Sequence, residues 1–122
     1  LDCTPWCNDL ISFCIDQVGE DNVYLLSSPG GDNWPAWSGK FLWVKKHLPK
    51  FKEKVILTRH KDLVVTQANW ILVDDKEATI AKVNKAGGKG ILCPAPWNSL
   101  RACVGNEFYV VEGAITDYRS QN

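Results

Sequence analysis

Four short apolar runs divide the chain, and they limit the folds that it can adopt. They are residues 23–26 (VYLL), 55–58 (VILT), 70–73 (WILV) and 90–93 (GILC). Continuous apolar runs of this length, bounded by turn-forming residues, are typical of buried parallel strands. Segments with helical patterns separate most of the runs. The alternation therefore predicts an α/β fold, a three-layer sandwich built on a mostly parallel sheet.

Three segments have the spacing of apolar residues that helices show. Thr4 is expected to cap the first and Pro5 to begin it, and Gly19 to end it. The segments are residues 5–18, 40–48 and 77–86. Residues 33–39 are expected to be irregular and 59–62 to form a polar loop. Residues 108–111 could be an edge strand or a tail that packs on the body.

The length and composition of the chain argue against several classes of protein. The 122 residues suit one domain, 1–122, and their 45% hydrophobic content excludes a disordered chain. Lys plus Arg and Asp plus Glu both number 14, so no overall field attracts a nucleic acid polymer. No apolar run approaches the roughly 18 residues of a membrane span. The chain is expected to be neither a nucleic-acid-binding nor a membrane protein.

The five cysteines give the only compositional sign of a compartment. They are Cys3, Cys7, Cys14, Cys93 and Cys103, an odd number without a Cys-x-x-Cys pair. We interpret them as reduced thiols, although a zinc site formed by some of them is an alternative. Reduced thiols favour a reducing, cytoplasmic location. The absence of Met, with Leu1 as the first residue, suggests that the chain is incomplete or processed at its start.

Polar residues follow three of the apolar runs, where each predicted strand ends. Ser27 and Ser28 follow the first, Lys61 lies in the loop after the second, and Asp74 and Asp75 follow the third. Ligands of open α/β sheets bind outside the carboxyl ends of the strands. We therefore expect these segments to converge on one crevice.

The residue types suit a phosphate group and a cation. Hydroxyl and backbone N–H groups at Ser27 and Ser28 can bind phosphate oxygens, and Lys61 can neutralise a phosphoryl group. The adjacent carboxylates of Asp74 and Asp75 repel each other, so they need water, a raised pKa or a cation, and Mg²⁺ with its preference for oxygen ligands would relieve the repulsion. Each signal has a structural alternative: a turn at the serines, a solvated lysine and a helix cap at the aspartates.

The order of these segments resembles the haloacid dehalogenase superfamily, in particular its 5′(3′)-deoxyribonucleotidases and related 5′-nucleotidases. The similarity spans about residues 5–97. The matching segments are Leu25-Leu26-Ser27-Ser28-Pro29, the helix pattern of Lys40, Trp43, Val44, His47 and Leu48, the segment Leu57-Thr58-Arg59-His60-Lys61, and Ile71-Leu72-Val73-Asp74-Asp75. The resemblance implies a Rossmann-like core and a Mg²⁺-dependent phosphatase acting on small phosphorylated substrates such as nucleoside monophosphates.

The resemblance also implies residue roles. Ser27 and Lys61 would act in catalysis, with Ser28 helping them to bind the phosphate, and Asp74 and Asp75 would hold Mg²⁺. The family's nucleophile lies in an Asp-x-Asp segment, which does not occur in these 122 residues. The core is thus expected to be incomplete at its N-terminal side, inactive alone, and open to self-association through unpaired strand edges.

Two other functions stay open at this stage. The first is a non-catalytic module of the same fold that binds a phosphate or a nucleotide. The second is an unrelated small α/β protein whose motifs match by chance. Stabilisation by Mg²⁺ with phosphate, without turnover, would favour the first over the second.

Overall fold

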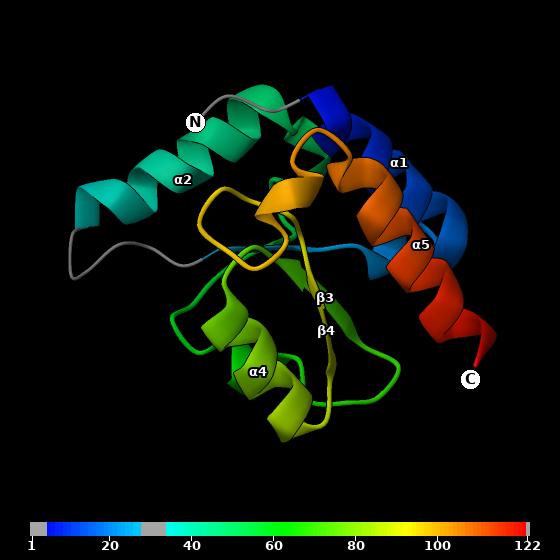
Figure 1. Ribbon diagram of the computed structural model, residues 1–122. Coiled ribbons are helices and arrows are strands. Elements are labelled where there is room, and N and C mark those ends of the chain that lie inside the picture. Colours follow the sequence, from blue (N-terminus) through cyan, green and yellow to red (C-terminus); the bar gives the residue numbers. More distant parts are fainter. Residues whose placement is uncertain (1–4, 28–33, 122) are drawn as a thin grey trace. The chain divides into compact units, whose positions relative to one another are not determined.

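The computed structural model describes residues 5–27 and 34–121, which form two compact units, Leu1–Arg59 and His60–Asn122 (Figure 1). Each unit has helices and one pair of parallel strands. The mixed α/β character with parallel strands is confirmed. The three-layer sandwich and the single domain stay predictions. The proposed cap Thr4 lies outside the described residues.

The first unit combines two helices with strands β1 and β2. Its order is α1 (Pro5–Val18), a 3₁₀ turn (Glu20–Asn22), β1 (Leu25–Ser27), α2 (Trp34–His47), a second 3₁₀ turn (Pro49–Phe51) and β2 (Val55–Leu57). β1 and β2 run parallel, with Leu26 opposite Ile56. Helix α1 ends as predicted, because Gly19 has a φ of +89° that other residues rarely adopt.

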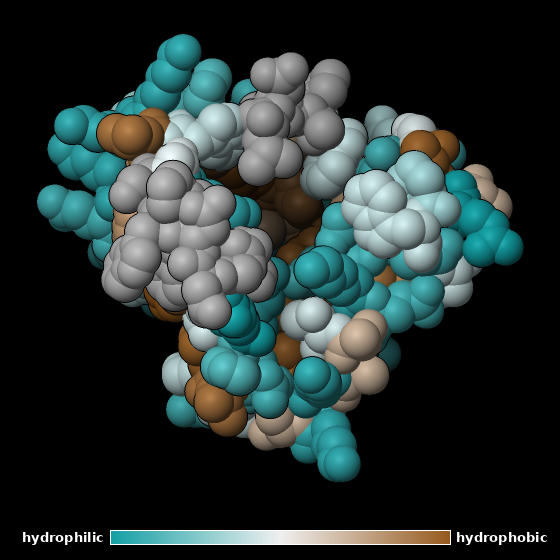
Figure 2. All heavy atoms as spheres, turned by 90° about the vertical axis from the view of Figure 1, so that its left-hand side faces the viewer, coloured by the Kyte–Doolittle hydropathy of each residue, from teal (hydrophilic) through white to brown (hydrophobic). Residues whose placement is uncertain are grey.

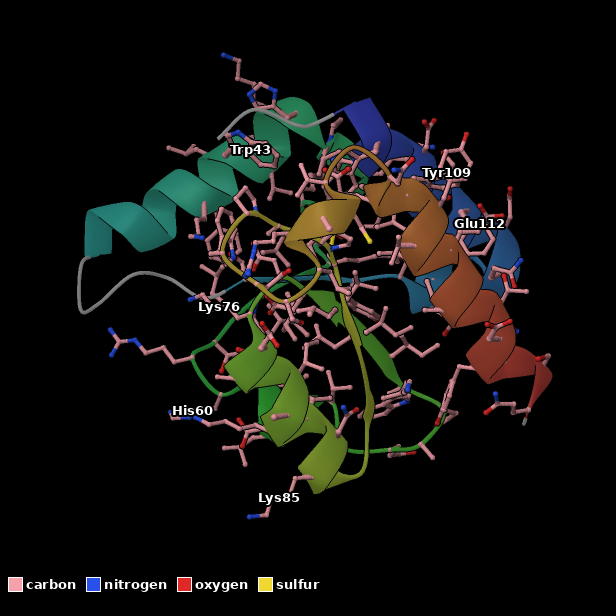
Figure 3. All side chains as sticks on the ribbon, viewed as in Figure 1. Trp43, His60, Lys76, Lys85, Tyr109 and Glu112 are labelled. Carbon is pink, nitrogen blue, oxygen red and sulfur yellow. The ribbon has the colours of Figure 1, made fainter. Side chains whose placement is uncertain are left out.

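The second unit contains strands β3 and β4 with three α-helices. Its order is α3 (Lys61–Val64), β3 (Ile71–Asp74), α4 (Glu77–Ala86), β4 (Lys89–Leu92), a 3₁₀ turn (Arg101–Cys103) and α5 (Glu107–Ser120). β3 and β4 run parallel, with Leu72 opposite Gly90. In Figure 3, Lys76 and Lys85 mark the two ends of α4, and Lys85 lies in its last turn, where a positive charge is favoured.

The packing of α4 against β4 fixes the carboxyl end of the parallel pair. Val83 of α4 is fully buried, and Leu72 of β3 and Ile91 of β4 are also part of the buried core. A Cβ on Gly90 would lie 3.0 Å from a methyl group of Ile80, so only glycine lets the helix approach this closely. Gly87 ends α4 in the left-handed conformation, with a φ of +108°, as the sequence predicted.

Helix α2 begins earlier than predicted. The sequence indicated an irregular segment at 33–39, because tryptophan, proline and glycine are concentrated there. In the structure α2 begins at Trp34. Pro35 lies in its first turn, where the backbone N–H that proline lacks has no partner within the helix. Proline therefore marks the start of this helix.

Two further expectations about secondary structure are wrong. Lys61 and Asp62, predicted in a polar loop, begin α3. Of the two alternatives for residues 108–111, the edge strand is wrong: they belong to α5, whose Val111 and Ile115 are buried, which agrees with a tail that packs on the body. The β-branched residues favoured a strand. The four-residue spacing of the buried side chains, which packs one face of a helix against the core, decides otherwise.

The surface is that of an ordinary globular chain. Hydrophilic side chains predominate among the described atoms on the face in Figure 2. Some large apolar side chains, such as Leu42, Leu63 and Tyr109, are exposed, as is normal for a protein surface. Within residues 5–27 and 34–121, no helix combines the length and the hydropathy that a membrane span needs.

Candidate functional site

A largely buried ion pair lies at the carboxyl end of β3. The Nζ atom of Lys61 donates a hydrogen bond of 2.6 Å to Oδ2 of Asp74. The side chains are only 13% and 7% exposed, respectively. Lys61 is the first residue of α3 and Asp74 the last residue of β3, so the contact joins a helix start to a strand end. A charge pair so shielded from water is uncommon outside functional sites or structural networks.

The second oxygen of the Asp74 carboxylate organises the turn that follows the strand. Its Oδ1 accepts hydrogen bonds from the backbone N–H of Asp75 at 2.7 Å and of Lys76 at 3.2 Å. Such a turn is common where an aspartate ends a regular element. It directs the chain from β3 into α4 and holds the two aspartates side by side.

The two aspartates have opposite electrostatic environments. Burial of Asp74 alone raises the pKa of its carboxyl, but the hydrogen bond and the charge of Lys61 outweigh this and lower the pKa. Burial also raises the pKa of Asp75, and the neighbouring Asp74 carboxylate raises it further. The environment of Asp74 therefore favours its ionised form. The environment of Asp75 disfavours a second negative charge, which a bound cation would stabilise.

Ser27 lies in the first unit, at the carboxyl end of β1. Its hydroxyl oxygen accepts a hydrogen bond of 2.8 Å from Nζ of Lys40 in α2, and its carbonyl accepts the N–H of Thr58 at 2.9 Å. The sequence assigned Lys40 to a helix motif but gave it no role at the site. Its position thirteen residues after Ser27 gives no local sign of contact. The lysine adds a positive charge beside the proposed phosphate-binding hydroxyl.

The structure thus brings together part of the predicted constellation. Lys61, Asp74 and Asp75 form one cluster in the second unit, and Ser27 pairs with Lys40 in the first. Ser28 lies outside the described residues. The single crevice that would unite all of them stays a prediction.

Metal-binding groups are sparse in the described parts of the chain. No cluster of three or more His, Cys, Asp or Glu side chains occurs in residues 5–27 and 34–121. Cys14, Cys93 and Cys103 carry free thiols, and Cys3 lies outside these ranges. The alternative of a cysteine zinc site has no supporting geometry among the described cysteines. Any cation at Asp74 and Asp75 would have two protein carboxylates.

Sequence reasoning missed a further polar residue beside this cluster. Asn98 is a buried polar residue, 3% exposed, in the turn that follows β4. Its side chain bonds to the backbone carbonyl of Asp75 at 2.9 Å. The proline-rich segment before it, residues 94–97, suggested only a break in the pattern. The only sign of this role in the sequence is that Asn98 follows the end of a predicted strand by a few residues.

A shallow, open groove of the second unit is not lined by the predicted site residues. It runs between β4 and α5, bordered by Lys89, Leu92, Ala114 and Tyr118. The ammonium group of Lys89 lies 5.1 Å from the centre of the Tyr118 ring, and the Tyr118 hydroxyl donates to the carbonyl of Ala68. These contacts account for the groove as a packing feature of α5.

Comparison with known proteins finds no significant match to this chain among family models, curated proteins or solved structures. The likeness of its motifs to the haloacid dehalogenase superfamily therefore has no support from an overall match. What can be said of function depends on the chemistry of the residues themselves.

Proposed function

We propose that this chain carries the phosphate- and cation-binding part of a haloacid dehalogenase-like phosphatase with a three-layer core. The substrate class is small phosphoric monoesters, with nucleoside monophosphates of the 5′-nucleotidase type as the first choice. The proposal is carried by one observation: the buried Lys61–Asp74 pair, with Asp75 beside it, at the carboxyl end of a parallel strand.

The charges of the cluster suit a phosphoryl group. Phosphoryl transfer spreads negative charge over the equatorial oxygens, and fixed cationic groups stabilise that charge without reorganisation. Asp74 holds the ammonium group of Lys61 in place with a hydrogen bond of 2.6 Å. An ammonium group has three N–H donors, so Lys61 can keep this bond and donate to a phosphate oxygen as well. Ser27 and Ser28 are proposed phosphate-binding residues too, and the ammonium group of Lys40 lies beside the Ser27 hydroxyl.

The two aspartates fit a cation that retains most of its water. Mg²⁺ takes six oxygen ligands and is often bound by one or two carboxylates together with substrate phosphates. Asp74 already accepts three hydrogen bonds, which leaves Asp75 as the less engaged carboxylate. Asp74 and Asp75 would thus hold Mg²⁺ weakly alone and more firmly with phosphate. When bound, the ion would neutralise phosphate charge and orient the group.

No turnover is expected from these 122 residues alone. The covalent chemistry of the proposed class needs a carboxylate nucleophile from an Asp-x-Asp segment, and the sequence has none. A second candidate function needs no nucleophile. A non-catalytic module of the same fold would bind phosphate or a nucleotide through the same residues and release it unchanged.

The outer edge of β3 is where another strand would pair. The carbonyls of Trp70 and Asp74 accept the N–H groups of Lys89 and Cys93, so alternate residues of β3 face β4. Ile71 and Val73 direct their backbone groups to the opposite edge. Pairing of another chain there would satisfy them. Sedimentation at increasing protein concentration tests this, and a monomer throughout would contradict self-association.

Thermal unfolding with inorganic phosphate, with Mg²⁺ and with both together tests the binding function. We expect the two ligands together to raise the melting temperature by more than the sum of their separate effects. Lys61→Met should abolish the gain, whereas Lys85→Met, which removes an exposed lysine of the same unit, should keep it. An equal melting temperature with and without both ligands would reject the proposal. Phosphate release from nucleoside monophosphates distinguishes the phosphatase from the binding module.

A further inference from the structure

Among the buried residues of the described parts of the chain, only Asn98 has a polar side chain. It lies in the second unit, between the Pro94–Trp97 turn and the 3₁₀ turn at Arg101–Cys103. Burying an amide is unfavourable unless its hydrogen-bonding groups find partners. The partners of Asn98 therefore indicate what it does in the fold.

The amide of Asn98 makes four hydrogen bonds with backbone groups. Its Nδ2 donates to the carbonyls of Asp75 and Cys93, each at 2.9 Å. Its Oδ1 accepts the N–H groups of Ala95 at 3.3 Å and Leu100 at 3.0 Å. One end of the amide thus faces two carbonyls and the other faces two N–H groups. This arrangement fixes the orientation of the amide and uses both of its Nδ2 hydrogens.

The bonds of Asn98 tie together the turns that follow two adjacent strands. Cys93 and Ala95 belong to the turn after β4, and Asp75 to the turn after β3. A second link runs parallel, because the N–H of Ser99 donates to Oε1 of Glu77 at 2.7 Å. The peptide between Asp75 and Lys76 is therefore held at its N–H by the Asp74 carboxylate and at its carbonyl by Asn98.

We propose that Asn98 is the positioning residue of the Asp74–Asp75 pair: it holds the Asp75 peptide and so fixes where the two carboxylates lie. Its effect on the geometry of the turn follows from the hydrogen bonds alone. Its effect on cation binding rests on the proposed function. Residues that orient the ligands of a metal ion typically change its affinity by about 10- to 100-fold when removed.

Three variants test this role. Asn98→Ala removes all four bonds. Asn98→Asp keeps an oxygen for Ala95 and Leu100 but presents a second oxygen to the carbonyls of Asp75 and Cys93, so it breaks only the two bonds that Nδ2 donates. Asn84→Ala is the matched control, because Asn84 also accepts a backbone N–H, that of Gly90 at 2.7 Å, near the opposite end of β4.

The first measurement is amide hydrogen exchange of the Asp75 and Lys76 N–H groups, which donate to Asp74. We expect the exchange of these N–H groups to be at least about tenfold faster in both Asn98 variants than their loss of global stability alone would cause. In Asn84→Ala, the exchange rate should change only as much as the global stability requires. If the exchange rates in both Asn98 variants change only as much as the global stability requires, the inference is overturned. This readout needs no ligand, so it remains decisive if the proposed function fails.

The second measurement is the affinity for Mn²⁺ with inorganic phosphate, with Mn²⁺ as a spectroscopic probe for Mg²⁺. We expect about tenfold weaker binding for Asn98→Ala and unchanged binding for Asn84→Ala. Equal affinity in the wild type and Asn98→Ala would overturn the inference for the cation site. If the wild type itself binds no Mn²⁺, the proposed function fails, and the exchange data alone decide the positioning role.

Discussion

Lys61 and Asp74 meet through a hydrogen bond of 2.6 Å, although thirteen positions separate them in the sequence. The contact brings the start of α3 to the end of β3 and shields both charged side chains from most of the surrounding water. Buried pairs of this kind are a weak source of stability, since desolvation offsets the attraction between the charges. Removing one partner, however, leaves the other charge buried without compensation. The pair can therefore be tested by single substitutions.

Lys61→Met should lower the free energy of unfolding by about 1–3 kcal/mol, because it leaves the Asp74 carboxylate buried without its cation. Chemical denaturation checks this. The matched control is Asp21→Asn, which removes the partner of Lys54 in an ion pair of 3.8 Å whose aspartate is fully exposed. We expect the control to lie within measurement error of the wild type. Equal losses in the two variants would contradict a special role for the Lys61 pair.

The two aspartates should contribute to stability with opposite dependence on pH. The folded state lowers the pKa of Asp74, so its contribution is present above the unfolded pKa and lost as the pH falls through the folded value. The folded state raises the pKa of Asp75, so its contribution is present at low pH and lost as the pH rises. Unfolding free energies from pH 3 to 7 measure both.

Substitution separates the two contributions. Asp74→Asn should remove the part of the stability that is lost in acid, whereas Asp75→Asn should make the protein more stable than the wild type at pH 7. Removing a destabilising charge stabilises the fold, as is common at functional sites. If Asp75→Asn is less stable than the wild type at neutral pH, the charge of Asp75 does not destabilise the fold, and this prediction is wrong.

Lys40 should take part in phosphate binding through its contact with Ser27. Its Nζ lies 2.8 Å from the Ser27 hydroxyl oxygen, so Lys40→Ala should reduce the stabilisation that phosphate gives. The loss of the hydrogen bond itself should cost only about 0.5–1.5 kcal/mol. Lys45→Ala, an exposed lysine of the same helix, is the control. Melting temperatures with and without both ligands distinguish the two lysines.

Cys93 should resist alkylation in the folded protein. Burial, with the negative charges of Glu107, Asp75 and Asp74, raises the pKa of its thiol to about 11, so almost no thiolate forms at pH 8. Mass spectrometry after iodoacetamide treatment should show Cys93 modified only when the protein is unfolded in urea. The thiol's contribution to stability is present below its unfolded pKa and is lost as the pH rises through 11. Rapid labelling of Cys93 under native conditions would contradict this.

Glycine substitutions test the connection between α4 and β4. Gly87→Ala should destabilise the protein by about 1–3 kcal/mol, because the residue has a φ of +108° and its Cβ would lie 2.7 Å from the carbonyl oxygen of Thr66. Gly113→Ala is the control within α5, where nothing lies within 4 Å of a new Cβ. It should stabilise by about 0.5–1 kcal/mol. Thermal unfolding of both variants measures the difference.

Several elements were predictable from local patterns. Helix α4 begins and ends at the predicted residues, since its apolar spacing and the two glycines after it are local signals. The four strands were found within one or two residues, because short apolar runs between turn-forming residues are also local. Helix α5 was missed, because its β-branched residues favour a strand and only the burial of one face decides for a helix.

The candidate site was also predictable only in part. The sequence by itself determined which residues end the parallel strands, and so it indicated Ser27, Lys61, Asp74 and Asp75. Only the tertiary structure decided that Lys61 bonds Asp74, that Lys40 reaches Ser27, and that Asn98 holds Asp75. These contacts join segments 13 to 23 residues apart. Sequence patterns report the local preferences of the backbone, whereas contacts between distant segments depend on how helices and strands pack.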